Sequence, residues 1–443
     1  MTPKDKILFS NLDKIIYSNF FRALQDKTQL FYTSSGTKVR TRLTHSIEVK
    51  NIACKIAEKL NKLNPHLNLD LQLIESISLA HDIGHTPFGH IGERTINKIL
   101  SKEDKLGGLI KSTNNIMRFK HNVNSMRVLF LHKICDWRIL EGVMFHSDIF
   151  YNNDNNEYKQ NPYDFLVNST SNVKNEIYKL HNIFEFDSEK KILHSLILEG
   201  QIVCVSDEIA QRIADISDGI KSRYFEKIKN IIGAPISLNT NEKLEKYIFE
   251  SFITDLISQS LINLSSYKGK EIRIKGISHN IYSEKIIDFS KSKKEENKKL
   301  EKLITNVMAN SEEVRESDSR SKYIIRQLFK AYFNDVKLLP DYIIKKYFNE
   351  IVYNENFINA SKKYNSLKPI LARQWVVDKN ELPKNVESIN FKEVEKYFDF
   401  IKKEVNNEDI SILYDKYIFE IGCYIASLSN SEVLNSYNKI YGI

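Results

Sequence analysis

The spacing of apolar residues is the feature that most limits the fold of this chain. Between residues 49 and 63, apolar side chains recur three and four positions apart, which is the repeat of an amphipathic helix. The same repeat returns near residues 73–80, 123–130 and 202–213. Only residues 271–277 alternate as a short strand does. The sequence therefore predicts an all-α protein with at most a small β element.

Two of the predicted helices end or begin at residues suited to chemistry. Thr44 is of a type preferred as an N-cap, so a helix is expected to start near His45. A second helix is expected to stop at Gly84, with His81 and Asp82 in its last turn. Adjacent helical residues point about 100° apart, so both side chains can reach one ion from different sides.

Four residues then form a candidate metal site. His81 and Asp82 need two further ligands, and His45 and Asp207, on other predicted helices, are the natural candidates. Two imidazoles and two carboxylates without a thiolate favour an octahedral ion such as manganese, magnesium, iron or cobalt over structural zinc. Such an ion would polarise a phosphoryl group and acidify water.

The alternative is that these histidines have no functional role, because a single histidine is more often a core or surface residue than a metal ligand. Here His81, His85 and His90 fall within ten residues of each other, in the segment HDIGHTPFGHIGE. Three glycines and a proline in that segment predict a sharply bent loop that brings backbone close to a ligand. Core packing gives no reason for such a density of histidines, so the segment is interpreted as part of a functional site.

Composition places the chain among packed globular proteins, with 42% hydrophobic and 28% charged residues. No run approaches the roughly 20 apolar residues of a membrane span, and no signal peptide is recognised. The four cysteines are far apart and form no CxxC pair, which is typical of a reducing cytoplasm. The length favours a main domain over residues 1–230 and a mostly helical C-terminal region over 231–443.

Several segments of the chain resemble a known family, the HD-domain deoxynucleoside triphosphate triphosphohydrolases, or dGTPase-like proteins. The likeness starts at FRALQDKTQLF and continues through RTRLTHSIEV, HDIGHTPFGHIGE, FKHNVNSMRVL and EGQIVCVSDEIAQRIADISDGI, in the family's order and spacing. Weaker likeness follows in YIIRQLF and YIASLSN. The resemblance implies an HD-domain helical core with a helical C-terminal lobe. It also implies hydrolysis of a deoxynucleoside triphosphate to the deoxynucleoside and tripolyphosphate.

The resemblance also implies a role for each matching residue. His45, His81, Asp82 and Asp207 match the metal ligands. Proton transfer at the α-phosphorus would fall to His90 with Glu93, which lies three residues later on the same helical face. Residues expected near the phosphates or the sugar are His85, His121, Arg42 and Gln29, the last reading the 3′-hydroxyl. Outside this family pattern, Arg42 could simply form a surface ion pair and Glu93 could offset a helix dipole.

One position departs from the family's pattern. Where many members have a tyrosine four residues after the last metal aspartate, this chain has Gln211, while Asp215 is retained. That position is associated with packing under the sugar, so discrimination against ribonucleotides is expected to be weaker here.

Two other functions stay open at this stage. An HD phosphohydrolase acting on another nucleotide or an alarmone would keep the metal residues without the context of Gln29 and Arg42. A nucleotide-sensing regulator that binds single-stranded nucleic acid would not require the complete set of ligands. The net charge of +8 is spread along the chain and is a weak signal for nucleic acid. A homo-oligomer is expected by analogy with the family alone.

Overall fold

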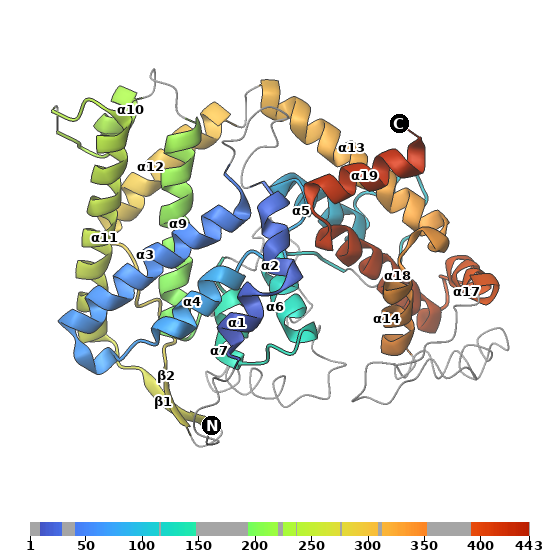
Figure 1. The fold of residues 1–443 in the computed structure, drawn as a ribbon, viewed down its shortest axis with the longest axis horizontal. Helices are drawn as coiled ribbons and strands as arrows, with labels where there is room; N and C mark the ends of the chain where they lie inside the picture. Colours follow the sequence, from blue (N-terminus) through green and yellow to red (C-terminus); the bar gives the residue numbers. More distant parts are fainter. Residues whose placement is uncertain are drawn as a thin grey trace, which may run out of the picture. The chain divides into compact units, whose positions relative to one another are not determined.

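The computed structural model describes residues 9–28, 40–114, 117–147, 194–219, 225–235, 237–274, 277–308, 312–351 and 391–442. Helices dominate these residues (Figure 1). The strands β1 (Lys270–Ile274) and β2 (Ile277–Ile281) pair in an antiparallel hairpin, with Ile274 opposite Ile277. The all-α prediction is confirmed. The single strand predicted at 271–277 overlaps β1, but its last residue, Ile277, begins β2, so the second strand of the hairpin was not predicted.

The chain divides into two compact units. The first unit contains Met1–Gly84 and His121–Ser317, and the second contains His85–Lys120 and Asp318–Ile443. Each unit is therefore built from two separate stretches of sequence. The predicted division at residue 230 stays a prediction.

The first unit is a helical core with the β hairpin attached. Its central helices α3, α4 and α9 contact one another, α7 contacts α4 and α9, and α3 crosses α9 in Figure 1. Fully buried Ile56, Ile74, Leu140 and Val203 supply apolar faces from these four helices. The helices are α1 (Asn11–Ile16), α2 (Asn19–Ala23), α3 (Arg42–Leu63), α4 (Leu71–Ala80), α6 (His121–Leu131), α7 (Trp137–Met144), α9 (Leu198–Gly219), α10 (Phe225–Ile231), α11 (Asn241–Ser266) and α12 (Lys291–Met308).

The predicted ends of two helices are wrong by a few residues. Helix α3 begins at Arg42, because Thr41 is the N-cap and its side chain accepts from the backbone N–H of Thr44. Thr44 returns a side-chain contact to the Thr41 backbone, so it is the third residue of a capping box and not the cap itself. Helix α4 ends at Ala80, which places His81 and Asp82 in the turn just beyond it.

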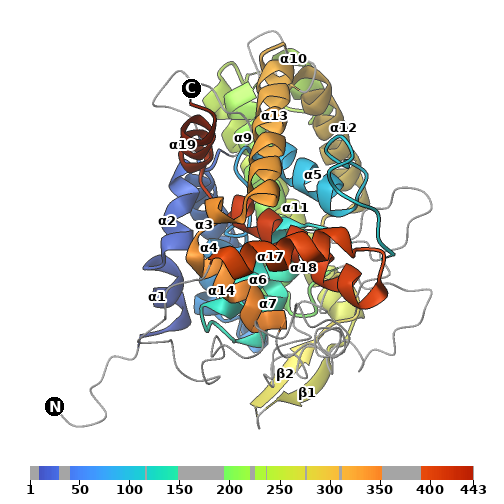
Figure 2. The same ribbon diagram turned by 90° about the vertical axis from the view of Figure 1, so that its right-hand side faces the viewer.

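The second unit packs helices around the buried helix α18. Helices α14 and α17 both contact α18, and the three lie together in Figure 2. Tyrosines fill much of this core, and the Tyr347 hydroxyl donates to the Leu413 carbonyl at 3.0 Å. The helices are α5 (Gly89–Leu100), α13 (Glu312–Asn334) from Asp318 onward, α14 (Asp341–Ile351), α17 (Phe391–Lys403), α18 (Glu408–Ser427) and α19 (Asn430–Tyr441).

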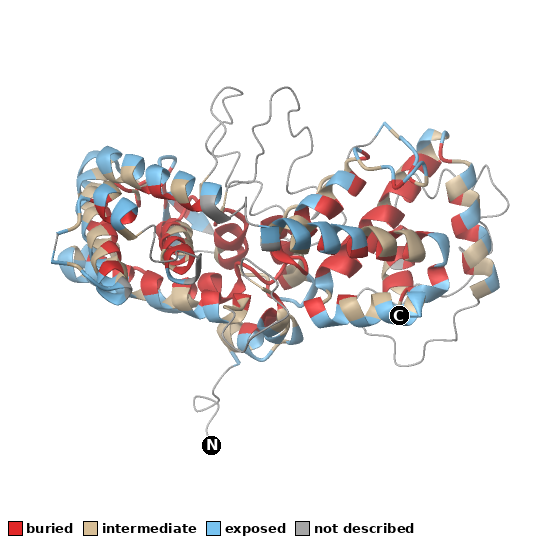
Figure 3. Ribbon diagram, turned by 90° about the horizontal axis from the view of Figure 1, so that it is seen from above, coloured by how far each residue is buried: buried red, intermediate tan, exposed pale blue. Residues whose placement is uncertain are grey.

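Buried residues form the inner faces of the helices in each unit, and exposed residues form the outer faces (Figure 3). This alternation around each helix is the amphipathic pattern expected for water-facing helices. Among the described helices, none combines the length and apolar character that crossing a bilayer requires.

Candidate metal centre and active site

Helix α3 carries the first two predicted site residues, Arg42 and His45, on its buried face. Arg42 is only 1% exposed, and its Nη1 donates to Asp82 Oδ2 at 2.6 Å. Its Nε and Nη2 have no hydrogen-bond partner among the described residues. Arg42 is thus not a surface residue: one side of its guanidinium holds Asp82, and the other side retains two buried donors.

The four predicted metal ligands lie together in the first unit. His45 Nε2 is 2.8 Å from Asp207 Oδ1. His81 Nε2 is 3.5 Å from Asp82 Oδ2 and 3.8 Å from Asp207 Oδ1. His45, His81 and Asp82 are buried, whereas the Asp207 side chain is 20% exposed. Helix α3, the turn that follows α4, and helix α9 therefore bring four ligand-type side chains to one place.

The electrostatics of this cluster favour positive charge. Burial alone would lower the pKa of His81, but the carboxylates of Asp82 and Asp207 and a hydrogen bond to Ser78 raise it to about 9. Burial opposes ionisation of Asp207, yet its hydrogen bond with His45 and the charge of His81 lower its pKa below the usual range. Both shifts reflect two carboxylates that need a cation nearby.

The donor set fits a divalent ion. His45, His81 and Asp82 each offer a ligand atom within 4.8 Å of the others. The buried Nε2 of His81 has no hydrogen-bond partner in the described part of the chain, although a buried ring nitrogen normally has one. A metal ion would satisfy this atom and offset the two carboxylates.

Helix α6 holds the turn that contains His81 and Asp82. Ser125 Oγ donates to the His81 carbonyl at 2.7 Å and accepts from the Gly84 N–H at 2.8 Å. Asn124 Nδ2 donates to the Gly84 carbonyl at 2.9 Å. A Cβ at Gly84 would lie 2.1 Å from the Ser125 backbone nitrogen. Glycine is therefore required here, because α6 and the turn approach too closely for any side chain.

Two further histidines of the first unit adjoin the ligand cluster. His121, the first residue of α6, was predicted to lie near the phosphates, and its Nε2 is 3.2 Å from His146 Nε2. His146 lies two residues beyond α7 and is 2% exposed. Burial, together with the nearby His81 and His121, lowers its pKa to about 3, so its ring is neutral.

Sequence reasoning missed His146, Asn124 and Ser125. The apolar run that precedes His146 predicts a buried helix end, which is the only signal that could have drawn attention to it. Asn124 and Ser125 lie inside FKHNVNSMRVL, where their polar side chains interrupt an apolar helix. Their contacts with the turn depend on tertiary structure and have no local pattern.

The second unit contains the predicted residues His85, His90 and Glu93. One ligand-type atom of each lies within 4.8 Å of the others, and the His85 and His90 rings are 5.5 Å apart. His85 and Glu93 are buried, whereas His90 is exposed. Glu93 Oε1 lies 3.6 Å from Lys120 Nζ. The structure thus brings the two predicted proton-transfer residues together.

The backbone around His90 is shaped by glycines. Gly89 has φ +62°, and a Cβ on Gly92 would lie 2.1 Å from the Pro87 carbonyl oxygen. Phe88 also has positive φ, and its N–H donates to Asn430 Oδ1 at 2.8 Å. The predicted sharp bend is therefore present, and α5 starts at its end with His90 in the first turn.

Of the two predicted sugar-side residues on α9, Asp215 belongs to a polar network. Gln211 is half-buried and Asp215 is 5% exposed. Arg212 lies between them in sequence; its Nη1 is 3.5 Å from Asp215 Oδ2, and its Nε donates to Asn297 Oδ1 on α12 at 2.7 Å. Gln29, predicted to read the 3′-hydroxyl, lies outside the described residues.

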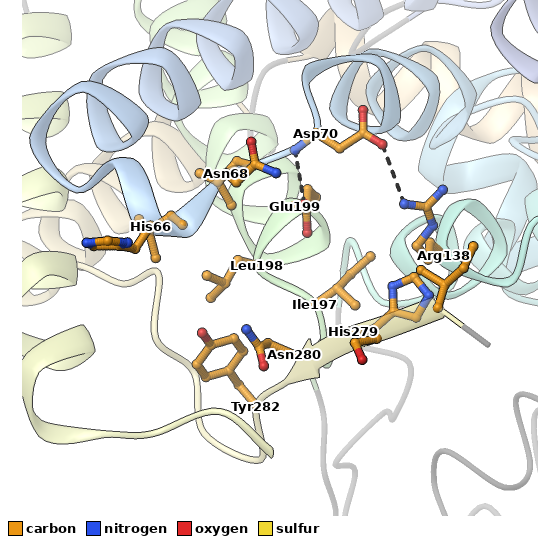
Figure 4. Close-up of a pocket in the computed structure, with 14 residues that line it drawn as sticks. His66, Asn68, Asp70, Arg138, Ile197, Leu198, Glu199, His279, Asn280 and Tyr282 are labelled. Atoms are coloured by element: carbon orange, nitrogen blue, oxygen red, sulfur yellow. Dashed lines mark hydrogen bonds and ion pairs between the residues drawn. The ribbon is translucent and has the colours of Figure 1, made fainter. Parts of the chain in front are cut away.

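A separate cavity of about 500 Å³ lies elsewhere in the first unit (Figure 4). Its walls include Arg138, Glu199 and Tyr282, and none of the predicted site residues lines it. The Asp70 carboxylate faces Arg138 at 3.4 Å, and its backbone N–H donates to Glu199 (Figure 4). These contacts fix the start of α4 and α9, so the cavity walls have a structural role.

Comparisons with known proteins agree with this geometry. Residues 42–211 match the HD domain, and residues 287–352 match the phosphohydrolase-associated domain. A deoxyguanosinetriphosphate triphosphohydrolase-like protein of Rickettsia bellii is 30% identical over 351 residues, which cover 74% of this chain and 80% of that protein. Proteins of the same description from Rickettsia akari and Rickettsia prowazekii are each 31% identical, over 78% and 80% of their lengths.

An HD domain implies a divalent metal ion, and the buried cluster of histidines and aspartates is consistent with one. His45, His81, Asp82 and Asp207 all fall within the matched residues 42–211. The extent of the match to the rickettsial proteins carries the assignment beyond the HD domain alone. This chain is an HD phosphohydrolase and belongs to the family of deoxyguanosinetriphosphate triphosphohydrolase-like proteins.

Proposed function

We propose that this protein hydrolyses deoxynucleoside triphosphates, dGTP or several of them, to the deoxynucleoside and tripolyphosphate. The observation that carries the proposal is the buried cluster of His45, His81, Asp82 and Asp207 beside Arg42, whose Nε and Nη2 have no partner among the described residues. With a divalent ion bound, the site would carry a net positive charge, and together with the spare buried donors of Arg42 it would suit a polyphosphate. The printed description of the rickettsial relatives supports the choice of nucleotide.

His45, His81, Asp82 and Asp207 would hold one divalent ion, with manganese, magnesium, iron and cobalt as candidates. When bound, such an ion supplies Lewis acidity at the phosphoryl group and makes water a stronger acid. The protein's contribution is to hold the ligands in place, through Arg42 at Asp82 and through Ser125 at the turn behind His81.

Arg42 would bind phosphate oxygens through the two donors that it does not use on Asp82. His121 and His85 would add N–H donors along the phosphate tail. On the sugar side, Gln29 would bind the 3′-hydroxyl, and Gln211 and Asp215 would lie against the deoxyribose. These assignments come from the family resemblance of each position.

His90 would transfer the proton that the 5′-oxygen of the leaving deoxynucleoside needs. Its exposure allows the ring to exchange protons with solvent. Glu93 lies close enough to orient the ring, and Lys120 pairs with Glu93. A positioned acid of this kind contributes roughly 10²- to 10⁴-fold to the rate.

Phosphorus NMR tests the proposal directly. The purified full-length chain is incubated with each of the four deoxynucleoside triphosphates and Mn²⁺, and the products are identified. Tripolyphosphate with the deoxynucleoside is expected. Pyrophosphate with a deoxynucleoside monophosphate would contradict the proposal, and so would inorganic phosphate alone.

The two alternative functions are tested beside it. Ribonucleotides and a pyrophosphorylated alarmone are included as substrates, and single-strand binding is measured at two salt concentrations, because phosphate contacts weaken as salt rises. Salt-sensitive binding without any hydrolysis would favour a nucleic-acid-binding regulator. A homo-oligomer is expected by analogy and is checked by light scattering.

A further inference from the structure

His146 is a histidine of the first unit that none of the assigned roles uses. It is 2% exposed, and its Nδ1 lies 2.6 Å from the Val143 carbonyl oxygen. A carbonyl oxygen only accepts hydrogen bonds, so Nδ1 carries the proton. The Nε2 atom of the neutral ring is therefore left with a lone pair.

His81, one of the proposed metal ligands, is prepared in the same way. Its Nδ1 lies 2.7 Å from the Ser78 carbonyl oxygen, three residues earlier in the chain, just as Val143 precedes His146 by three. Histidines that bind metals usually donate the other ring N–H to a carbonyl or carboxylate, which fixes the tautomer and the ring orientation. By this criterion His146 is as well prepared to bind an ion as His81.

The two rings are also neighbours. Their centroids are 5.0 Å apart at 72°, and ligand atoms of His81, His146 and Asp207 all lie within 4.8 Å of one another. Opposite ligands of an octahedral ion with bonds of about 2.1 Å are about 4.2 Å apart. A small inward movement around an ion would therefore bring all three atoms to bonding distance.

We infer that His146 is a fifth protein ligand of the divalent ion, beside His45, His81, Asp82 and Asp207. This inference rests on the metal site of the proposed function and extends it. Five protein ligands leave one octahedral position, which either a phosphate oxygen or a water would occupy. The contact between His146 Nε2 and His121 Nε2, at 3.2 Å, uses the same lone pair and is the bond that the ion would replace.

A second ion held by His121 and His146 is the competing arrangement, and charge argues against it. One divalent ion and Arg42 already exceed the charge of Asp82 and Asp207 by one unit. A second ion would raise this excess to three units in a largely buried site, and uncompensated buried charge is costly. A single ion with a larger protein shell avoids this cost.

Pulsed electron paramagnetic resonance of the Mn²⁺-loaded full-length chain tests the inference without any variant. Couplings to three directly bound imidazole nitrogens are expected, from His45, His81 and His146. A count of two nitrogens would overturn the inference and leave the proposed function standing. Failure to bind any of the candidate ions, Mn²⁺, Mg²⁺, Fe²⁺ or Co²⁺, would overturn both.

A variant gives an independent measurement. His146→Phe keeps a ring of similar size, so it should lose one nitrogen coupling and bind Mn²⁺ roughly 10- to 100-fold more weakly. His279→Phe is the matched control, because the His279 ring packs edge-on against Trp137 at 5.3 Å, outside the cluster. Unchanged Mn²⁺ affinity in a folded His146→Phe would contradict the inference. If this variant fails to fold, the nitrogen count of the wild type decides.

Discussion

The predicted site residues of the two units differ in their surroundings. In the first unit, His45, His81 and Asp82 are buried and contact other ligand-type side chains within their own unit. In the second unit, His90 is exposed and its neighbour Glu93 pairs with Lys120. Metal ligands need a fixed, dry environment, whereas a proton-transfer group must exchange protons with its surroundings. The comparison suggests that metal binding and proton transfer can be separated by mutation.

The largest expected effect comes from removing a first-unit carboxylate. Asp82→Ala takes away a ligand and leaves the buried Arg42 without its partner, which costs about 3–5 kcal/mol. Bound metal should be lost, and dNTP hydrolysis should fall by about 10³-fold or more. Elemental analysis and a product assay measure the two losses.

Asp399→Ala is the control for this variant. The Asp399 side chain is 77% exposed and pairs only loosely with Lys402, at 3.8 Å, so its removal should leave metal content and turnover intact. Stoichiometric metal together with full turnover in Asp82→Ala would show that the metal assignment is wrong.

The second effect belongs to the second unit. His90→Ala should retain one metal per chain and bind nucleotide, while kcat falls by roughly 10²- to 10⁴-fold. Folding should be unchanged, because His90 is exposed. The exposed His66 offers a matched control, His66→Ala, with normal kcat. If His90→Ala loses its metal, then His90 is a metal ligand, and metal binding and proton transfer are not divided between the two units.

The sequence was informative where chemistry repeats locally. Local sequence features predicted four side chains that the structure brings together. These are the adjacent pair His81 and Asp82, His45 near the start of α3, and Asp207 inside α9. Helical periodicity predicted the fold class, because each helix must bury one apolar face. The first residue of a helix is harder to predict than the helix itself, because Thr41 and Thr44 are both suitable N-caps and only the backbone geometry distinguishes them.

Contacts between distant segments could not be predicted. His146 lies just beyond α7 and approaches His81 from 65 residues further along the chain, and its lone pair matters only through that approach. The chain passes from the first unit to the second between Gly84 and His85. This boundary follows from packing, and the amino-acid composition does not change there in a way that would reveal it. For the same reason Ser125, which fixes the turn from α6, looked like an ordinary helical residue.

The partners of buried carboxylates also differ between the two units. In the second unit, Asp415 lies 2.9 Å from Lys102, and Glu420 lies 2.8 Å from Lys346. Among the described residues, those that donate to Glu141 of the first unit are neutral: the Ser195 hydroxyl and the Leu196 N–H, each at 2.6 Å. When no cation offsets the free-energy cost of burying an ionised carboxylate, the pKa of that carboxylate rises.

The third prediction follows from this difference. Burial raises the pKa of Glu141 to about 7, against the hydrogen bonds of Ser195 and Leu196, whereas an unfolded glutamate titrates near 4.5. The folded state thus holds a proton that the unfolded state has released, so this contribution to stability is complete below pH 4.5 and is lost as the pH rises through 7. The loss is at most about 3 kcal/mol.

Urea unfolding at pH 5 and pH 8 measures this contribution. The free energy of unfolding of the wild type should fall between these values by up to about 3 kcal/mol more than that of Glu141→Gln, which has no such proton to lose. Glu250→Gln, whose carboxylate is 63% exposed, should keep the wild-type pH dependence. Equal pH dependence in Glu141→Gln and wild type would remove the proposed contrast between buried carboxylates.

The last prediction concerns whether a residue of the first unit also discriminates between ribose and deoxyribose. Gln211 is half-buried on α9, four residues after Asp207, where a tyrosine is usual in the family that this chain resembles. A rigid ring leaves less room for a 2′-hydroxyl than a flexible glutamine, which can also hydrogen-bond it. Gln211→Tyr should therefore lower kcat/KM for GTP relative to dGTP by roughly 10- to 200-fold. Gln259→Tyr makes the same change at a half-buried position of α11 and should leave the ratio unaltered. If the ratio is also unmoved in Gln211→Tyr, this residue does not face the sugar. Discrimination would then have to come from other residues, and the first unit would be left with metal and phosphate binding alone.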